Sequence, residues 1–323
     1  MITLRVVSRP GGTAGASTGS AAVRSLPTAP GGPERSGVET SDIVTDIVRP
    51  TAAPDLLGAR TFLFVPGDRP ERFAKAAASG ADVVVLDLED AVAPAAKPAA
   101  REAVREWLAA GNPGLVRINP PGTEWYEADV VAVVAAGSAP VMLPKAQDPA
   151  EVAALVAALG ADARVVPLVE TALGVHRAVE VCGVAGVVRA GFGSVDLASE
   201  LGVDPVDREA LRYARSALVL GSRAAGAGAP IDGVTTAVRD EQVLLEDCVH
   251  GLSLGFTAKM CIHPTQVGPV ATAFSPTREQ VEWARAVVGA SAGGGVAVVD
   301  GKMIDRPVVE RARALLLRAG ESA

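Results

Sequence analysis

The sequence predicts an α/β protein built as a closed (β/α)₈ barrel, with a disordered, low-complexity N-terminal tail and a C-terminal helical extension. From Arg60 onward, short apolar runs alternate with segments of helical periodicity, and eight such units over roughly 200 residues favour a closed barrel over an open sheet. The runs are continuously apolar, as expected of parallel strands covered on both faces. Polar residues follow the runs, at the end of a barrel where active sites lie.

The expected strands are residues 61–65, 83–88, 115–118, 140–143, 164–169, 187–190, 230–232 and 257–262. Each is followed by a helical segment or by a loop that leads to one. Beyond them we expect a helix over 277–289, a short strand over 296–299, and a final helix over 307–319 that begins with Pro307. We therefore divide the chain into a tail (1–55), a barrel domain (56–275) and a C-terminal segment (276–323).

The first 55 residues differ from the rest in composition. Residues 8–36 are dense in Pro, Gly, Ser, Thr and Ala and have no sustained period, so they bury too little surface to offset the entropy of ordering. Arg5, Arg9 and Arg24 precede the first acid, Glu34, which is a weak feature of organelle transit peptides. Because no amphipathic stripe accompanies them, we prefer an unstructured extension.

Composition excludes several classes of function. The formal net charge is −7 and the pI is about 5.2, which argues against nucleic acid or an anionic membrane as the main partner. Cys182, Cys248 and Cys261 lie far apart and predict neither a disulfide framework nor a cysteine zinc site. No apolar run approaches the roughly 18 residues of a membrane span. We expect a soluble, cytoplasmic protein.

Two acids at strand ends predict a metal site. Glu170 follows the run 164–169, and Asp196 follows the next run through a glycine-rich turn. If the strands are parallel neighbours, both carboxylates point into one space. A few hard oxygen ligands, with positions left for water and substrate, fit Mg²⁺ better than zinc or calcium.

Other polar residues end further strands: Asp87 with Glu89 and Asp90, Arg117 with Asn119, Lys145, Asp232 and His263. Two patterns carry less weight. The segment Gly191-Phe192-Gly193 begins like a dinucleotide fingerprint but lacks its third glycine. His176, His250 and His263 show no metal-binding spacing, and single histidines are usually scaffold.

Several ordered segments resemble the citrate lyase β-subunit-like branch of the HpcH/HpaI aldolase family: FLFVPGDRPERF at 62–73, LDLED at 86–90, VRIN at 116–119, MLPKA at 142–146, LVETA at 168–172 and CIHP at 261–264. The resemblance covers about Arg60 to Gly320. It implies a Mg²⁺-dependent (alternatively Mn²⁺-dependent) lyase on a TIM barrel, usually a homotrimer, acting on malyl-CoA, citramalyl-CoA or citryl-CoA.

The resemblance assigns roles to matching positions. Glu170 and Asp196 match the metal ligands, and Arg117 matches the arginine that grips the oxo-acid half, the alternative being a structural salt bridge. Asp87, Glu89 and Asp90 are expected to surround the metal waters or orient Arg117, or to cap a helix. Lys145 is expected beside the substrate. Neighbouring acids keep a lysine protonated, so we expect Lys145 to balance their charge and not to form a Schiff base.

Further positions concern the C-terminal segment and the thioester. Asp305 matches an aspartate on a lid that reaches a neighbouring subunit and serves as acid/base, the alternative being a helix cap. Arg69, Arg72 and Lys75 are candidates for the CoA phosphates, or form a solvated face. Val195 departs from the pattern, since many members carry Glu there, which leaves the acceptor acid and the CoA preference open.

The expected reaction is cleavage of a 3-hydroxyacyl-CoA into a 2-oxo acid and a thioester enolate, or the reverse condensation. Two other classes remain open: a CoA-independent class II aldolase acting on a free hydroxy-oxo acid, and a catalytically weak citrate-lyase-like subunit. The C-terminal segment favours the CoA-ester lyase over the aldolase. The intact Glu170, Asp196 and Arg117 argue against a catalytically weak subunit.

Overall fold

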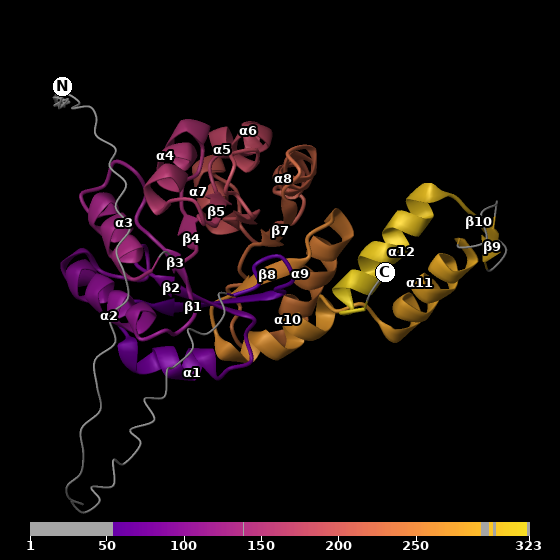
Figure 1. The fold of residues 1–323 in the computed structure, drawn as a ribbon, viewed down its shortest axis with the longest axis horizontal. Helices are drawn as coiled ribbons and strands as arrows, with labels where there is room; N and C mark the ends of the chain where they lie inside the picture. The colour runs from indigo at the N-terminus through magenta and orange to yellow at the C-terminus, as the bar shows by residue number, and fades with distance from the viewer. Residues whose placement is uncertain (1–53, 138, 292–296, 300–301, 322–323) are drawn as a thin grey trace, which may run out of the picture. The chain divides into compact units, whose positions relative to one another are not determined.

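The computed structural model describes residues 54–137, 139–291, 297–299 and 302–321. The N-terminal tail expected at 1–55 lies almost wholly outside the described residues. Within them, eight parallel strands pair in chain order and the last pairs with the first, which closes a barrel inside a ring of helices (Figure 1). The predicted barrel is therefore confirmed. No helix in the described ranges is both long enough and apolar enough to cross a bilayer.

The barrel strands are β1 (Thr61–Pro66), β2 (Val83–Asp87), β3 (Leu115–Arg117), β4 (Val141–Leu143), β5 (Val165–Val169), β6 (Arg189–Phe192), β7 (Gly228–Asp232) and β8 (Ala258–Cys261). Around them lie α1 (Phe73–Ala77), α2 (Lys97–Ala109), α3 (Tyr126–Ala135), α4 (Pro149–Leu159), α5 (Ala172–His176), α6 (Ala178–Cys182), α7 (Ser194–Leu201), α8 (Arg212–Ala224), α9 (Glu241–Leu254) and α10 (Val267–Ala273). The short 3₁₀ helices η1 (Pro70–Arg72), η2 (Pro94–Ala96) and η3 (Pro264–Gln266) each begin with proline, which suits a first helical turn.

The strands form two separate apolar layers. Alternate residues point inward, so Phe62, Val85 and Leu168 belong to the core inside the barrel. Their neighbours Leu63 and Leu86 belong to the layer between the strands and the helices. Because both faces are covered, the runs are apolar without alternation, as the sequence predicted.

The chain continues through α11 (Arg278–Ser291), a hairpin of β9 (Ala297–Val299) and β10 (Lys302–Ile304), and α12 (Arg306–Arg318). The helices pack on each other through Ala284, Val287, Leu315 and Leu316, a cluster of their own. These elements match the predicted helix, strand and helix, with β10 as an addition.

The sequence placed the sixth strand over 187–190, two residues too early. The strand begins at Arg189, a charged residue that is only 1% exposed. Its guanidinium donates to the carbonyls of Leu56, Ala59 and Pro230 and to Thr257 Oγ1, at 2.8–3.3 Å. Burial lowers the pKa of Arg189 to about 10. Leu56 and Ala59 join the inner core, so Arg189 fastens the N-terminal segment across the amino end of the barrel.

Replacing Arg189 with alanine is expected to lower the free energy of unfolding by about 3 kcal/mol, because several buried carbonyls lose their donor together. Urea unfolding followed by circular dichroism measures this. Arg69→Ala is the control, since that side chain is 55% exposed and its loss should cost less than about 0.5 kcal/mol. Equal midpoints for the two variants would contradict the fastening role.

Candidate active site

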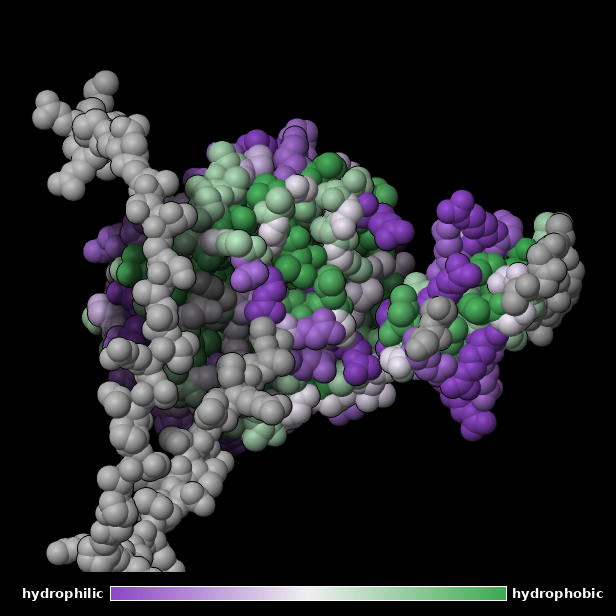
Figure 2. Space-filling view, viewed as in Figure 1, coloured by the Kyte–Doolittle hydropathy of each residue, from purple (hydrophilic) through white to green (hydrophobic). Residues whose placement is uncertain are grey.

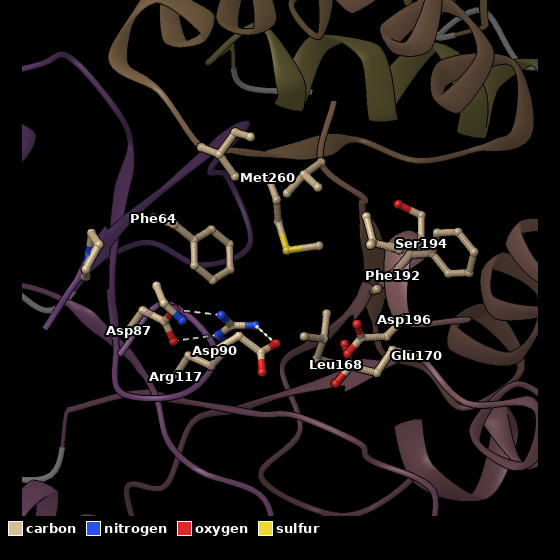
Figure 3. Close-up of a pocket in the computed structure, with 16 residues that line it drawn as sticks. Phe64, Asp87, Asp90, Arg117, Leu168, Glu170, Phe192, Ser194, Asp196 and Met260 are labelled. Atoms are coloured by element: carbon tan, nitrogen blue, oxygen red, sulfur yellow. Dashed lines mark hydrogen bonds and ion pairs between the residues drawn. The ribbon is translucent and has the colours of Figure 1, made fainter. Parts of the chain in front are cut away.

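The carboxyl ends of the strands surround a cavity of about 300 Å³. Its charged lining residues are carboxylates and one guanidinium, and the rest of the lining is largely apolar (Figure 3). The lining residues are Phe64, Pro66, Asp87, Asp90, Ala91, Arg117, Leu168, Glu170, Phe192, Gly193, Ser194, Val195, Asp196, Val234, Met260 and Ile262. The cavity therefore brings together Arg117, Glu170 and Asp196, the three residues on which the sequence-based hypothesis depends.

Arg117 is held from one side by acids of the neighbouring strand. Asp87 and Arg117 are register partners on β2 and β3, and the guanidinium donates to both Asp87 oxygens at 2.7 and 2.6 Å. The remaining nitrogen, Nη1, lies 2.9 Å from Glu89 Oε2 and 3.7 Å from Asp90 Oδ2. Burial opposes the positive charge, but these acids outweigh burial and raise the pKa of Arg117 above its ordinary value. The result is a permanently charged planar fork at the cavity wall.

Asp87 is fixed in turn by the loop that follows β2. Its two oxygens accept hydrogen bonds from the backbone N–H groups of Glu89 and Ala91 at 2.9 and 3.2 Å. Asp87 is 1% exposed, so its carboxylate cannot swing toward solvent. The geometry makes Asp87 a support for Arg117, one of the three roles that the sequence analysis left open for this acid cluster.

Glu170 and Asp196 come from consecutive units of the barrel. Glu170 directly follows β5, and Asp196 lies in the first turn of α7, just after β6. Burial raises the pKa of Glu170 to about 7 and that of Glu89 to about 8, and the mutual repulsion of nearby acids adds to both shifts. Both acids therefore hold a proton more readily than a free glutamate does, and a cation placed beside them would favour their charged forms.

Lys145 completes this group from the end of β4. Its backbone N–H donates to Glu170 Oε1 at 2.8 Å, and its ammonium contacts Asp196 Oδ2 and lies 3.7 Å from Glu170 Oε1. Lys145 has φ 52°, the only positive φ outside glycine in the described ranges. Backbone in this region is uncommon for a bulky residue and clusters at functional sites. Partial burial opposes its charge, yet the acids keep the pKa of Lys145 raised, which disfavours a Schiff base.

Gly193 explains the glycine-rich turn before Asp196. A Cβ atom there would lie 2.4 Å from both Cβ and Oε2 of Glu170, closer than real contacts allow. The glycine is needed for close packing against the carboxylate and has no part in a dinucleotide fingerprint. A Gly next to a strand end was visible in the sequence, but its partner 23 positions earlier was not.

The donor set fits a small divalent cation. Two carboxylates converge on one ammonium, so a positive charge already lies between them, and Gly193 allows the Glu170 carboxylate to pack closely. No group of three or more His, Cys, Asp and Glu side chains is arranged around a metal position in the described part of the chain. Two hard protein ligands with water and substrate in the remaining positions is a common arrangement for Mg²⁺ and a poor one for zinc.

Other predicted residues lie elsewhere. Arg72 and Lys75 line a second groove together with His263, and this groove shares Phe64, Pro66 and Ile262 with the cavity. Arg69 does not line the groove. Its Nε atom lies 3.8 Å from Asp68 Oδ1. The groove also contains His263, which the sequence placed at a strand end but to which no role was assigned.

Asp305 does not line the cavity in this single chain. It caps the N-terminus of α12, where its Oδ1 accepts from the backbone N–H of Val308 at 3.3 Å. This is the helix-cap alternative. The role on a neighbouring subunit remains a prediction.

Lys97 is a supporting residue that the sequence reading missed. It is 5% exposed and donates to the carbonyls of Leu88 and Glu89 and to Asn119 Oδ1 at 2.7–2.9 Å. It therefore shapes the loop that carries Glu89 and Asp90. No sequence pattern distinguishes a lysine with this role from any other lysine at the start of a helix.

Comparison with known proteins agrees with this architecture. Residues 60–264 match the family model described as HpcH/HpaI aldolase/citrate lyase. A citrate lyase subunit beta-like protein of Mycobacterium tuberculosis is 41% identical over 268 residues, covering 81% of this chain and 96% of the relative. A (3S)-malyl-CoA thioesterase of Cereibacter sphaeroides is 35% identical over 270 residues, covering 80% and 94%.

Among solved structures, the M. tuberculosis protein CitE in complex with magnesium, acetoacetate and coenzyme A is similar with a TM-score of 0.71. That pair is 39% identical, and the match covers 81% of this chain and 98% of the other. The same protein has also been solved with magnesium and pyruvate, with a TM-score of 0.65 and 35% identity over 80% of this chain and 99% of the other. The motif-based prediction is confirmed, and the chain belongs to the HpcH/HpaI aldolase/citrate lyase family.

Proposed function

We propose that the protein is a Mg²⁺-dependent carbon–carbon lyase that cleaves, or forms, a 3-hydroxyacyl-CoA. The products of cleavage are a 2-oxo acid and a thioester enolate, which becomes an acyl-CoA on protonation. One observation carries the proposal: the Arg117 fork and the Glu170–Asp196 pair face the same cavity from opposite walls (Figure 3). The relatives with magnesium, small oxo acids and coenzyme A support it.

In the proposed site, Glu170 and Asp196 hold the metal ion. The bound ion supplies positive charge beside the oxygen that turns negative as the carbon–carbon bond breaks. Arg117 binds the carboxylate of the oxo-acid half through its planar fork, and Asp87 prevents that fork from turning away. Lys145 gives up its place between the two acids and stays at the edge of the site.

Proton transfer is assigned to Asp305 of a neighbouring copy in a homotrimer. The aspartate accepts the hydroxyl proton during cleavage and returns it during condensation. Apolar side chains exposed on outer helices, among them Val179 and Leu220, support contact between copies. Figure 2 shows apolar patches, in green, between hydrophilic ones, in purple, on one face of the barrel.

The CoA portion is assigned to the groove beside the cavity. Arg72, Lys75 and His263 provide basic groups for the phosphates, with Arg69 on the same loop. Because the groove and the cavity share Phe64 and Ile262, a ligand can span both, with its thioester over the cavity.

Thioester hydrolysis is the second candidate, because a C. sphaeroides relative is named a (3S)-malyl-CoA thioesterase. The two reactions give different products: a lyase releases a 2-oxo acid and acyl-CoA, whereas a thioesterase releases free CoA and a hydroxy acid. Mass analysis after incubating a panel of 3-hydroxyacyl-CoA thioesters with and without Mg²⁺ distinguishes them.

Asp196→Asn is expected to weaken Mg²⁺ binding at least roughly 100-fold, because a neutral amide replaces one of two charged ligands. Calorimetric titration with MgCl₂ measures the loss, and turnover should fall with it. The melting temperature should change little, since the Asp196 side chain is 34% exposed. Glu200→Gln on the same helix is the control and should bind Mg²⁺ normally. Unchanged affinity in Asp196→Asn would refute the metal assignment.

Lys145→Met is expected to tighten Mg²⁺ binding roughly fivefold, because no ammonium remains to be displaced from a partly exposed pair. The metal-free variant should also melt at a lower temperature, since its two acids have lost their counter-ion. Calorimetry and thermal melts provide the readouts, with Lys75→Met as control. Weaker Mg²⁺ binding would mean that Lys145 assists the ion.

A shared site is tested by mixing Arg117→Gln with Asp305→Ala. Each variant alone should be nearly inactive, whereas mixed oligomers contain some sites with both intact residues and should regain part of the activity. Each variant unfolded and refolded with itself is the control. If the mixture stays as inactive as its components, Asp305 does not serve a neighbouring site.

A further inference from the structure

Two arginines meet at the C-terminal end of α10, outside the cavity and the groove beside it. Arg60, directly before β1, donates from Nη1 to Ser275 Oγ at 2.6 Å. Arg318, the last residue of α12, donates from Nη2 to the carbonyl oxygen of Phe274 at 2.8 Å. Because Phe274 and Ser275 are consecutive, the two guanidiniums lie near each other, although they come from elements far apart in the sequence.

No acid balances these two charges. Asp82 accepts from the backbone N–H of Arg60 at 2.9 Å and forms no ion pair with its side chain. Glu321, shortly after Arg318, pairs instead with Arg285 at 2.6 Å. Burial lowers the pKa of Arg318, and the positive charge of Arg60 lowers it further. In the part of the chain that the structure describes, the two guanidiniums therefore repel each other without a counter-ion.

The pair also has more donors than acceptors. Nε of Arg60 is buried and has no partner. Nη2 of Arg60 and Nη1 of Arg318 have no acceptor among the described residues either, and they are not buried. Both side chains are half-buried, so a solute can reach them from solvent. Water would satisfy the open donors, but only an anion would also remove the repulsion.

The alternative is that the arginines only cap α10. The last carbonyls of a helix attract cations, and Arg318 serves the Phe274 carbonyl in this way. However, a helix end carries only about half an elementary negative charge. Two guanidiniums exceed that charge several-fold, so capping leaves most of their positive charge unbalanced.

We propose that Arg60 and Arg318 form a binding site for a tetrahedral oxyanion of the phosphate class. Each planar guanidinium can offer a pair of parallel N–H groups to oxygen, and phosphate has enough oxygens for both arginines at once. Arg60 precedes β1, so the site lies at the amino end of the barrel, away from the cavity at the carboxyl end. It is thus independent of the proposed lyase chemistry.

Such an anion joins the barrel to the C-terminal segment. Helices α11 and α12 pack on each other in a cluster of their own, separate from the barrel core. Among the described residues, the bond from Arg318 to Phe274 is the one side-chain hydrogen bond between α12 and the barrel domain. An oxyanion shared by Arg60 and Arg318 adds a second link and stabilises the placement of α12, whose first turn is capped by Asp305.

The first test is calorimetric titration of the unchanged protein with inorganic phosphate, without Mg²⁺ and at an ionic strength fixed with NaCl. Saturable binding is expected, and Arg318→Gln should weaken it at least roughly tenfold, because charge-assisted hydrogen bonds are lost. Arg72→Gln is the matched control, since Arg72 lies in the groove beside the cavity and should not affect this binding. Phosphate should also raise the melting temperature of the unchanged protein more than that of Arg318→Gln.

Two results would overturn the proposal: no phosphate binding by the unchanged protein, or equal binding by a folded Arg318→Gln variant. Arg60→Gln is the second variant and should show the same loss, so that either variant decides if the other does not fold. Neither result bears on the lyase proposal, because the assay contains no thioester.

A further titration identifies the source of the phosphate group, using the part of the binding that Arg318→Gln removes. Methyl phosphate that binds as tightly as inorganic phosphate supports a site for a phosphate monoester on a larger molecule. Weaker binding of the ester supports a site for the free ion. Acetate is the control, and if it binds as tightly as phosphate, the assignment to the phosphate class is wrong.

Discussion

Negative charge around one end of the barrel is the condition on which the rest of the site depends. Asp87, Glu89, Asp90, Glu170 and Asp196 lie near two cations, Arg117 and Lys145. Such a group is stable only if each cation is held in place and further positive charge is available. Asp87 fixes Arg117, the left-handed backbone directs Lys145, and the remaining deficit makes a divalent ion a natural occupant.

Much of the fold was predictable because buried strands require apolar residues, which are visible in the sequence. Strands covered on both faces, such as β2 and β5, are nearly continuous apolar runs, and the polar residues at their carboxyl ends mark the end of the barrel where the cavity lies. The sixth strand was placed two residues too early because Gly191 and Phe192, which complete it, were assigned to a glycine-rich turn. The burial of Arg189 was not predictable either, because its carbonyl partners lie up to 133 positions away along the chain.

Single residues of the site were less predictable than its location. Arg117, Glu170 and Asp196 could be selected from the sequence, because they lie at the ends of expected strands and match motifs of a known family. The roles of Lys97 and Gly193 depend on what faces them across the fold, which no local pattern encodes. Asp305 illustrates a different limit: in one chain it caps a helix, and the proposed contact with another copy would leave no periodic signal in the sequence.

The segment fastened by Arg189 has a kinetic consequence. Since Leu56, Ala59 and the packed interior close the amino end of the barrel, a small molecule in the cavity has to enter and leave through the carboxyl end. In the proposed reaction, a thioester bound in the neighbouring groove would block that route. Turnover should therefore be ordered: in synthesis the small acid enters before the acyl carrier, and in cleavage the carrier departs before the small acid escapes.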